Sequence, residues 1–114
     1  MGQFEEAIAH YEIALSKASG DNGQEAVIYY NKGLAYASLM KWEQAINDYR
    51  LACEKINDPT KDQKERFQLG VTLRRIDGKL NESISELKKA CEGQNTKPNY
   101  INNLGLSYFE NEQW

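Results

Sequence analysis

The chain has 114 residues, of which 40% are hydrophobic and 27% charged, and its formal net charge is −3. This composition is typical of one globular domain. The acidic balance excludes a whole-chain attraction to nucleic acid or anionic lipid, and no apolar run approaches the roughly 20 residues of a membrane span. Glu5 and Glu6 stand where a secretory signal needs basic and then apolar residues. We therefore expect a cytoplasmic, intracellular protein with no nucleic-acid partner and no membrane partner.

The first predicted helix lies within residues 1–21. Its apolar side chains recur at i, i+3, i+4 and i+7, the spacing of one face of an amphipathic helix. They are Phe4, Ala7, Ile8, Tyr11, Ala14 and Leu15. His10 lies opposite this face or near its edge, so we expect it to be solvated or to line a groove rather than to act in catalysis.

Turn-forming residues separate the helices that follow. Asp21-Asn22-Gly23 precedes a predicted helix over 24–38. Asp58-Pro59-Thr60 precedes a predicted helix over 61–76, and the spacing of Thr60 and Gln63 is that of a capping box.

Turn-forming residues also mark the last two connections between predicted helices. Asp77-Gly78 turns the chain into a predicted helix over 80–92. Gly93 suits the C-terminal cap of that helix, and Pro98 suits the first turn of the final one.

Three segments repeat one pattern: QFEEAIAHYEIAL, KWEQAINDYRLAC and KLNESISELKKAC. Ala7 and Ala45, and then Ala45 and Ser83, are each 38 residues apart. Cys53 and Cys91 align in this repeat with a leucine of the first segment. We therefore expect small buried apolar residues rather than a redox pair or metal ligands, and no metal site is predicted.

A second helix type lies between these segments, as VIYYNKGLAYASL, ERFQLGVTLRRI and YINNLGLSYFEN. Its three copies align on Gly33, Gly70 and Gly105. Glycine inside a helix costs up to about 1 kcal/mol relative to alanine, so its recurrence indicates close packing against a neighbouring helix. The other side of that contact is expected to be formed by Ala7, Ala45 and Ser83.

Together the two helix types resemble the tetratricopeptide repeat family, whose motif begins W-x2-L-G-x2-Y and continues small-x3-aromatic-x2-Ala. The matching residues are Leu69-Gly70 with Leu73, Leu104-Gly105 with Tyr108, Ala45 with Tyr49 and Ala52 behind Trp42, and Ala7 with Tyr11 and Ala14. The resemblance implies an all-α fold, a right-handed α-α superhelix (solenoid) of antiparallel helix pairs. Lys32 and Arg66 depart from the pattern, which has leucine and a large aromatic residue at those places.

Extended over residues 1–114, the resemblance implies a single array segment of a longer protein. It comprises the second helix of a truncated repeat (1–21), two repeats (22–59 and 60–97) and the first helix of a truncated repeat (98–114). Trp114 then aligns with Trp42. Such a segment would leave terminal apolar side chains partly exposed and open to self-association, namely Phe4, Ile8, Tyr11, Leu104, Tyr108 and Trp114.

Glycine-bearing helices line the concave, ligand-binding groove of this family. Mapped by position, the resemblance implies these peptide-binding candidates: Tyr30, Asn31, Leu34, Lys64, Phe67, Gln68, Arg74, Asn99, Asn102 and Asn103. The same mapping adds Val27, Val71, Leu106 and, as an alternative to Arg74, Arg75.

Asn31, Gln68 and Asn103 each precede their glycine by two residues. A row of amides could both donate to and accept from an extended peptide backbone, although three solvated polar residues would give the same pattern. Some family members bind chaperone C-termini through a carboxylate clamp of Lys, Asn and Arg. Asn31 and Lys64 could take two of its places, but Gln68 stands where the Arg is needed.

No metalloprotease, phosphate-loop or nucleophile-elbow motif occurs in the sequence, so we expect neither enzyme activity nor a cofactor. The leading interpretation is a protein–protein interaction scaffold that binds a peptide or partner protein in the groove. Two alternatives stay open. The chain could be a structural solenoid segment of a large multiprotein assembly, or a non-catalytic appendage of an enzyme whose active domain lies elsewhere.

Overall fold

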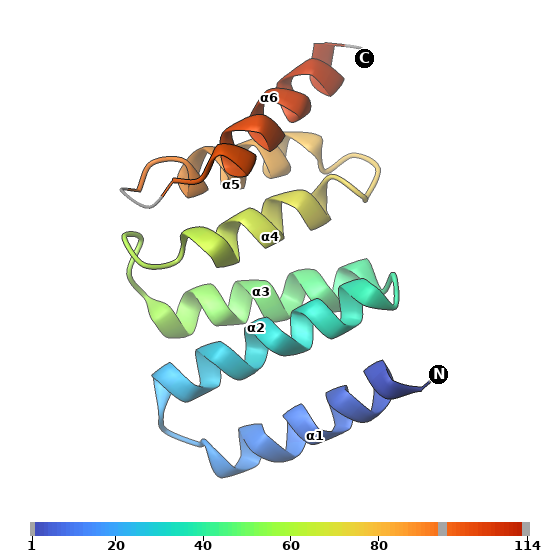
Figure 1. Cartoon of the computed structure of the whole chain (residues 1–114), viewed down its shortest axis with the longest axis vertical. Helices are drawn as coiled ribbons and strands as arrows, with labels where there is room; N and C mark the ends of the chain where they lie inside the picture. The colour runs from blue at the N-terminus through green and yellow to red at the C-terminus, as the bar shows by residue number, and fades with distance from the viewer. Residues whose placement is uncertain (1, 94–95, 113–114) are drawn as a thin grey trace. The chain divides into compact units, whose positions relative to one another are not determined.

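The computed structural model describes residues 2–93 and 96–112, and these form six α-helices with no strand among them (Figure 1). The all-α part of the expected fold class is therefore confirmed. The helices belong to two compact units, Met1–Asn57 and Asp58–Trp114, which we call the first and the second unit. Within each unit, successive helices run in opposite directions and are joined by short connections (Figure 1).

The first unit contains α1 (Gln3–Lys17), α2 (Asn22–Ser38) and α3 (Trp42–Ile56), and α2 packs against both of the others. Helix α2 begins two residues earlier than predicted, because the side chain of Asp21 caps it. Asp21 Oδ1 accepts a hydrogen bond of 3.1 Å from the backbone N–H of Gln24. Gly20 ahead of the cap has a φ of 89°, a left-handed conformation that glycine adopts without strain.

The second unit contains α4 (Gln63–Leu73), α5 (Leu80–Ala90) and α6 (Pro98–Glu112), and α5 packs against both of the others. Helix α4 is shorter than the predicted 61–76, and the capping box was wrong. The backbone N–H and the hydroxyl of Thr60 both donate to Asp58 Oδ1, at 2.9 and 2.6 Å, so Thr60 belongs to the preceding turn.

Helix α5 ends at Ala90, and the prediction that Gly93 caps it was wrong. Gly93 does not have the positive φ of such a cap; instead, the side chain of Gln63 packs directly against its backbone, where a Cβ would collide. The hydroxyl of Thr96 donates to the carbonyls of Cys91 and Gly93, at 2.9 and 2.7 Å, and so satisfies backbone groups at this end. Helix α6 begins at Pro98 as predicted.

Two of the three repeated glycines lie at close helix–helix contacts. A Cβ on Gly33 would be 2.6 Å from Tyr49 Cε1 of α3, and a Cβ on Gly70 would be 2.7 Å from Leu87 Cγ of α5. Ser83, on the facing side of the second contact, is buried and donates a 2.6 Å hydrogen bond to the carbonyl of Gly70. These contacts confirm the packing role of Gly33 and Gly70.

The expected exposure of apolar side chains on the first and last helices is confirmed in part. Phe4 and Tyr108 are exposed, and Tyr11 and Leu104 are half-buried. Ile8 is buried, contrary to expectation, because α1 packs against α2 through the face that carries it. Trp114 lies outside the described residues. Among the cysteines, Cys53 is buried as expected, Cys91 is half-buried, and neither forms a disulfide.

Candidate functional site

The predicted groove residues fall on one face of each glycine-bearing helix. They lie six, three and two residues before the glycine and one residue after it, which is the i, i+3, i+4, i+7 spacing of a single helical face. We call these side chains the stripe: Val27, Tyr30, Asn31 and Leu34 on α2; Lys64, Phe67, Gln68 and Val71 on α4; Asn99, Asn102, Asn103 and Leu106 on α6.

The exposure of the stripe sets it apart from the packing side of the same helices. Every side chain of the stripe is half-buried or exposed. The residues two positions after each glycine are all buried: Ala35, Thr72 and Ser107. The stripe is therefore less buried than the packing positions of the same helices.

In the first unit the stripe is carried by α2 alone. Its aromatic member, Tyr30, lies with its ring centroid 5.9 Å from that of the buried Tyr49, at an interplanar angle of 47°. Asn31 and Leu34 are half-buried beside it, and Val27 is exposed. The ring of Tyr30 thus packs against that of Tyr49, and the side-chain amide of Asn31 lies on the same helical face as Tyr30 and Leu34.

In the second unit the stripe is carried by α4 and α6. Phe67 stacks on Tyr100 of α6 with ring centroids 4.4 Å apart, so one of its faces belongs to the packing between these helices. Burial is the larger cause that raises the pKa of Tyr100, and the nearby carboxyl of Glu65 adds to it. The half-buried Gln68 follows Phe67 directly, and the half-buried Val71 lies one turn further along α4.

The three amides of the predicted row differ in their hydrogen bonding. Asn103 Oδ1 accepts from Arg74 Nη2 at 3.2 Å, and Asn103 Nδ2 donates to the carbonyl of Asn99 at 2.8 Å. Within residues 2–93 and 96–112, no hydrogen bond is made by the side-chain amides of Asn31 and Gln68. Only these two members of the row are therefore available to a ligand without breaking a contact.

Arg74 does not lie on the stripe. It follows the last residue of α4 and reaches α6, where its Nη1 donates to the carbonyl of Asn103 and to Ser107 Oγ, both at 3.2 Å. Its Nε lies 3.8 Å from Glu110 Oε1. Arg74 thus joins α4 to α6, and Arg75 lies in the turn that follows the helix.

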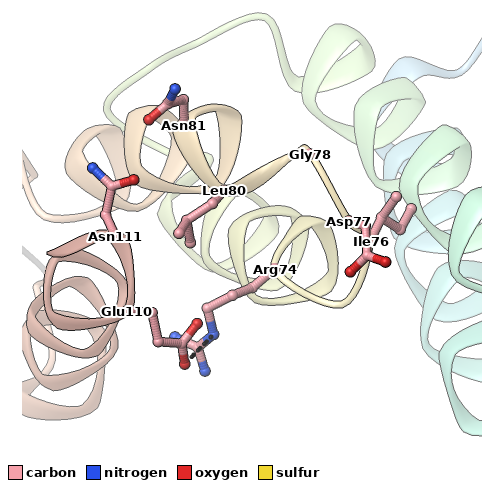
Figure 2. Close-up of a pocket in the computed structure, with 8 residues that line it drawn as sticks. All are labelled: Arg74, Ile76, Asp77, Gly78, Leu80, Asn81, Glu110 and Asn111. Carbon is pink, nitrogen blue, oxygen red and sulfur yellow. Dashed lines mark ion pairs between the residues drawn. The ribbon is translucent and has the colours of Figure 1, made fainter. Parts of the chain in front are cut away.

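A cavity of about 510 Å³ lies beside this arginine in the second unit. It is lined by Arg74, Ile76, Asp77, Gly78, Leu80, Asn81, Glu110 and Asn111 (Figure 2). The ion pair between Arg74 and Glu110 occupies one side of it (Figure 2). The charged side chains that line it are those of Arg74, Asp77 and Glu110.

The two departures from the family pattern turn out to be ion-pair residues. Lys32 Nζ lies 3.6 Å from Asp48 Oδ1. Arg66 contacts two carboxylates, Asp62 Oδ2 at 2.9 Å from its Nε and Glu86 Oε1 at 2.7 Å from its Nη1. Burial raises the pKa of Asp48 to about 6, which the neighbouring lysine only partly offsets. Sequence periodicity had shown where these cations stand but not which acids face them.

Two kinds of site are not formed by the described residues. No group of three His, Cys, Asp or Glu side chains could hold a metal ion there, and none of the helices has both the length and the apolar character needed to cross a membrane. Comparison with known proteins finds no family model that matches the chain and no matching curated protein.

Proposed function

We propose that this chain is a protein–protein interaction scaffold that binds a peptide or a partner protein through the stripe. One observation carries the proposal. On all three glycine-bearing helices the same four stripe positions are unburied. The residue two positions after each glycine is buried on every one of these helices. The recurrence gives each of the three helices four unburied side chains at equivalent positions.

The chemistry of the stripe suits an extended polypeptide. Tyr30, Leu34 and Val71 supply apolar contact area, which provides most of the affinity in protein interfaces. The side-chain amides of Asn31 and Gln68 can each donate to and accept from a backbone, with a net contribution of about 0.5–1.5 kcal/mol per hydrogen bond.

The tetratricopeptide resemblance extends this proposal to the architecture. A right-handed superhelix of antiparallel helix pairs would place such stripes along a concave groove. The alternation of two helix types and the recurrence of the glycine contact in two helix pairs support it. The proposed scaffold is intracellular, non-catalytic and independent of any cofactor.

The test uses the whole chain with a photo-crosslinking amino acid at one position at a time. Placed at the exposed Val27 or Asn102 of the stripe, the probe should capture a protein from native lysate. Placed at the exposed Glu54 of α3 or Lys88 of α5, helices that carry no stripe, it should not. Capture only from the control positions would refute the proposal.

Two matched variants then measure how much the side-chain amides of Asn31 and Gln68 contribute to the binding affinity. Asn31→Ala combined with Gln68→Ala should weaken binding of the captured protein about tenfold, the loss of two modest hydrogen bonds. Asn47→Ala, the same change at an exposed position of α3, should leave the affinity unchanged. Equal affinity in all three proteins would show that the amides have no part in binding.

A further inference from the structure

The turn between α4 and α5 carries an Asp77-Gly78 pair that the proposed function does not use. Both residues are exposed and lie outside the two helices, which end at Leu73 and begin again at Leu80. Gly78 has a φ of 84°, and a Cβ placed on it would meet no described neighbour within 4 Å. The space around this pair is therefore open.

The carboxylate of Asp77 and the backbone nitrogen of Gly78 are not held by other groups. Within the part of the chain that the structure describes, the carboxylate makes no hydrogen bond or ion pair, and the N–H of Gly78 donates to no acceptor. The nearest guanidinium, that of Arg74, points to Glu110 and away from Asp77 (Figure 2). Both groups are thus available to react with each other.

The equivalent turn of the first unit differs at this nitrogen. Leu39-Met40, which lies 38 residues earlier, takes the place of Asp77-Gly78 between α2 and α3. The N–H of Met40 donates to the carbonyl of Ala37 at 3.0 Å, and Met40 also adopts a positive φ, 58°. A left-handed turn is therefore built there with neither aspartate nor glycine and with its nitrogen engaged.

We propose that Asp77 is a site of spontaneous isoaspartate formation. The nitrogen of Gly78 attacks the side-chain carboxyl carbon of Asp77, a C–N bond forms, and water leaves with the carboxyl hydroxyl and the amide proton. Water then opens the five-membered succinimide. Opening at the side-chain carbonyl restores aspartate, whereas opening at the main-chain carbonyl leaves the backbone running through the side chain. Glycine favours the attack because no side chain shields its nitrogen.

A second pair in the chain, Asn22-Gly23, should be protected by the fold. It can close the same ring with loss of ammonia, and at neutral pH an amide reacts without the protonation that a carboxylate needs. These residues, however, lie in the first turn of α2, where Asp21 Oδ1 accepts from the N–H of Gln24 at 3.1 Å. The helical ψ at Asn22 holds the nitrogen of Gly23 away from the ring-closing position. Folding therefore opposes the reaction at Asn22 and not at Asp77.

Isoaspartate at residue 77 would change the connection between two packed helices. It adds a methylene carbon to the main chain inside the turn in which the N–H of Lys79 donates to the carbonyl of Ile76 at 3.2 Å. We expect the modified chain to melt at a lower temperature, because this turn sets the approach of α4 to α5. The α-carboxylate that the rearrangement frees is the group that isoaspartyl methyltransferases esterify from S-adenosylmethionine. Such an enzyme is the expected partner of the modified turn.

The test ages the whole purified chain at mildly acidic and at neutral pH, both folded and unfolded in urea, and locates isoaspartate by peptide fragmentation. In the folded chain it should accumulate at Asp77, and faster at the acidic pH because the protonated carboxyl is the reacting form. Unfolding should change the rate at Asp77 by less than about threefold and should speed the loss of ammonia from Asn22 at least about tenfold.

Asp77→Glu is the matched control. It keeps an exposed carboxylate beside Gly78 but would need a six-membered ring, so accumulation should stop. An isoaspartyl methyltransferase with labelled S-adenosylmethionine should label the aged unmodified chain and not this variant. Asp77→Asn should react faster than Asn22 in the folded chain. A folded chain that forms no isoaspartate at Asp77 would overturn the proposal, and so would an Asn22 that reacts as fast as the Asp77→Asn site.

Discussion

The α2–α3 pair and the α4–α5 pair solve the same packing problem with different side chains. In the first, the rigid ring of Tyr49 lies against Gly33. In the second, the branched side chain of Leu87 lies against Gly70, and the hydroxyl of Ser83 also bonds to that glycine's carbonyl. The constant element is the missing Cβ, which lets a large side chain reach the backbone. What fills the space can vary.

The ion pairs differ between the two helix pairs as well. Lys32 makes one contact of 3.6 Å with Asp48, whereas Arg66 makes hydrogen-bonded contacts of 2.9 and 2.7 Å with two carboxylates. A guanidinium presents several donors in a fixed plane and can serve two acids at once, while an ammonium acts as a point charge. The second pair therefore depends more on its cation than the first.

The largest expected change in stability comes from substituting the glycine that the two helix pairs share. Gly33→Leu and Gly70→Leu should each lower the free energy of unfolding by about 3 kcal/mol, because even a Cβ would lie under 3 Å from fully buried side chains. Urea unfolding followed by circular dichroism measures this loss.

Gly105→Leu is the matched control for that prediction. Its position has open space, so the change should leave stability unaltered or raise it by up to about 1 kcal/mol through helix propensity. If all three substitutions had the same effect, the glycines would be acting through backbone flexibility and the packing interpretation would be wrong.

A smaller effect should distinguish the two cations. Arg66→Met leaves the buried Asp62 without its cation and leaves Glu86 only its 3.9 Å contact with Lys89, and we expect a loss of about 2 kcal/mol. Lys32→Met should cost about half as much. Denaturant unfolding compares them, with the exposed Lys88→Met expected to lie within about 0.5 kcal/mol of the unmodified chain. Equal losses at Arg66 and Lys32 would remove the distinction between the pairs.

Sequence periodicity could predict the helices and two of the three glycine contacts because both depend on local spacing, whereas Gly105 meets no described neighbour within 4 Å. The spacing misplaced several helix ends by two or three residues, including those beside Thr60 and Thr96, whose side chains bond to nearby groups in the turns. The positions of the stripe came from the family resemblance, and the structure leaves all of them unburied. The bonding of Arg74 to Asn103 could not be predicted from spacing, because it joins residues 29 positions apart through side-chain geometry that no repeat pattern specifies.

The smallest expected effect concerns pH and the first helix pair. Burial raises the pKa of Asp48 to about 6 from 3.8, Lys32 lowers it in part, and the charge of Glu12 adds slightly to the rise. Between roughly pH 4 and 6 the unfolded chain releases this proton while the folded chain keeps it, so the free energy of unfolding must fall as pH rises through that window.

Asp48→Asn isolates this contribution from the carboxyls of Asp62 and Glu65, whose pKa values burial also raises. The unmodified chain should lose on the order of 1 kcal/mol more stability than the variant between pH 4 and 7, a figure reduced from the full shift by solvent screening. Thermal melts of both proteins across that range provide the comparison. An identical pH dependence in the two proteins would mean that the folded and unfolded chains hold the Asp48 proton equally well, and that Lys32 fully compensates for its burial.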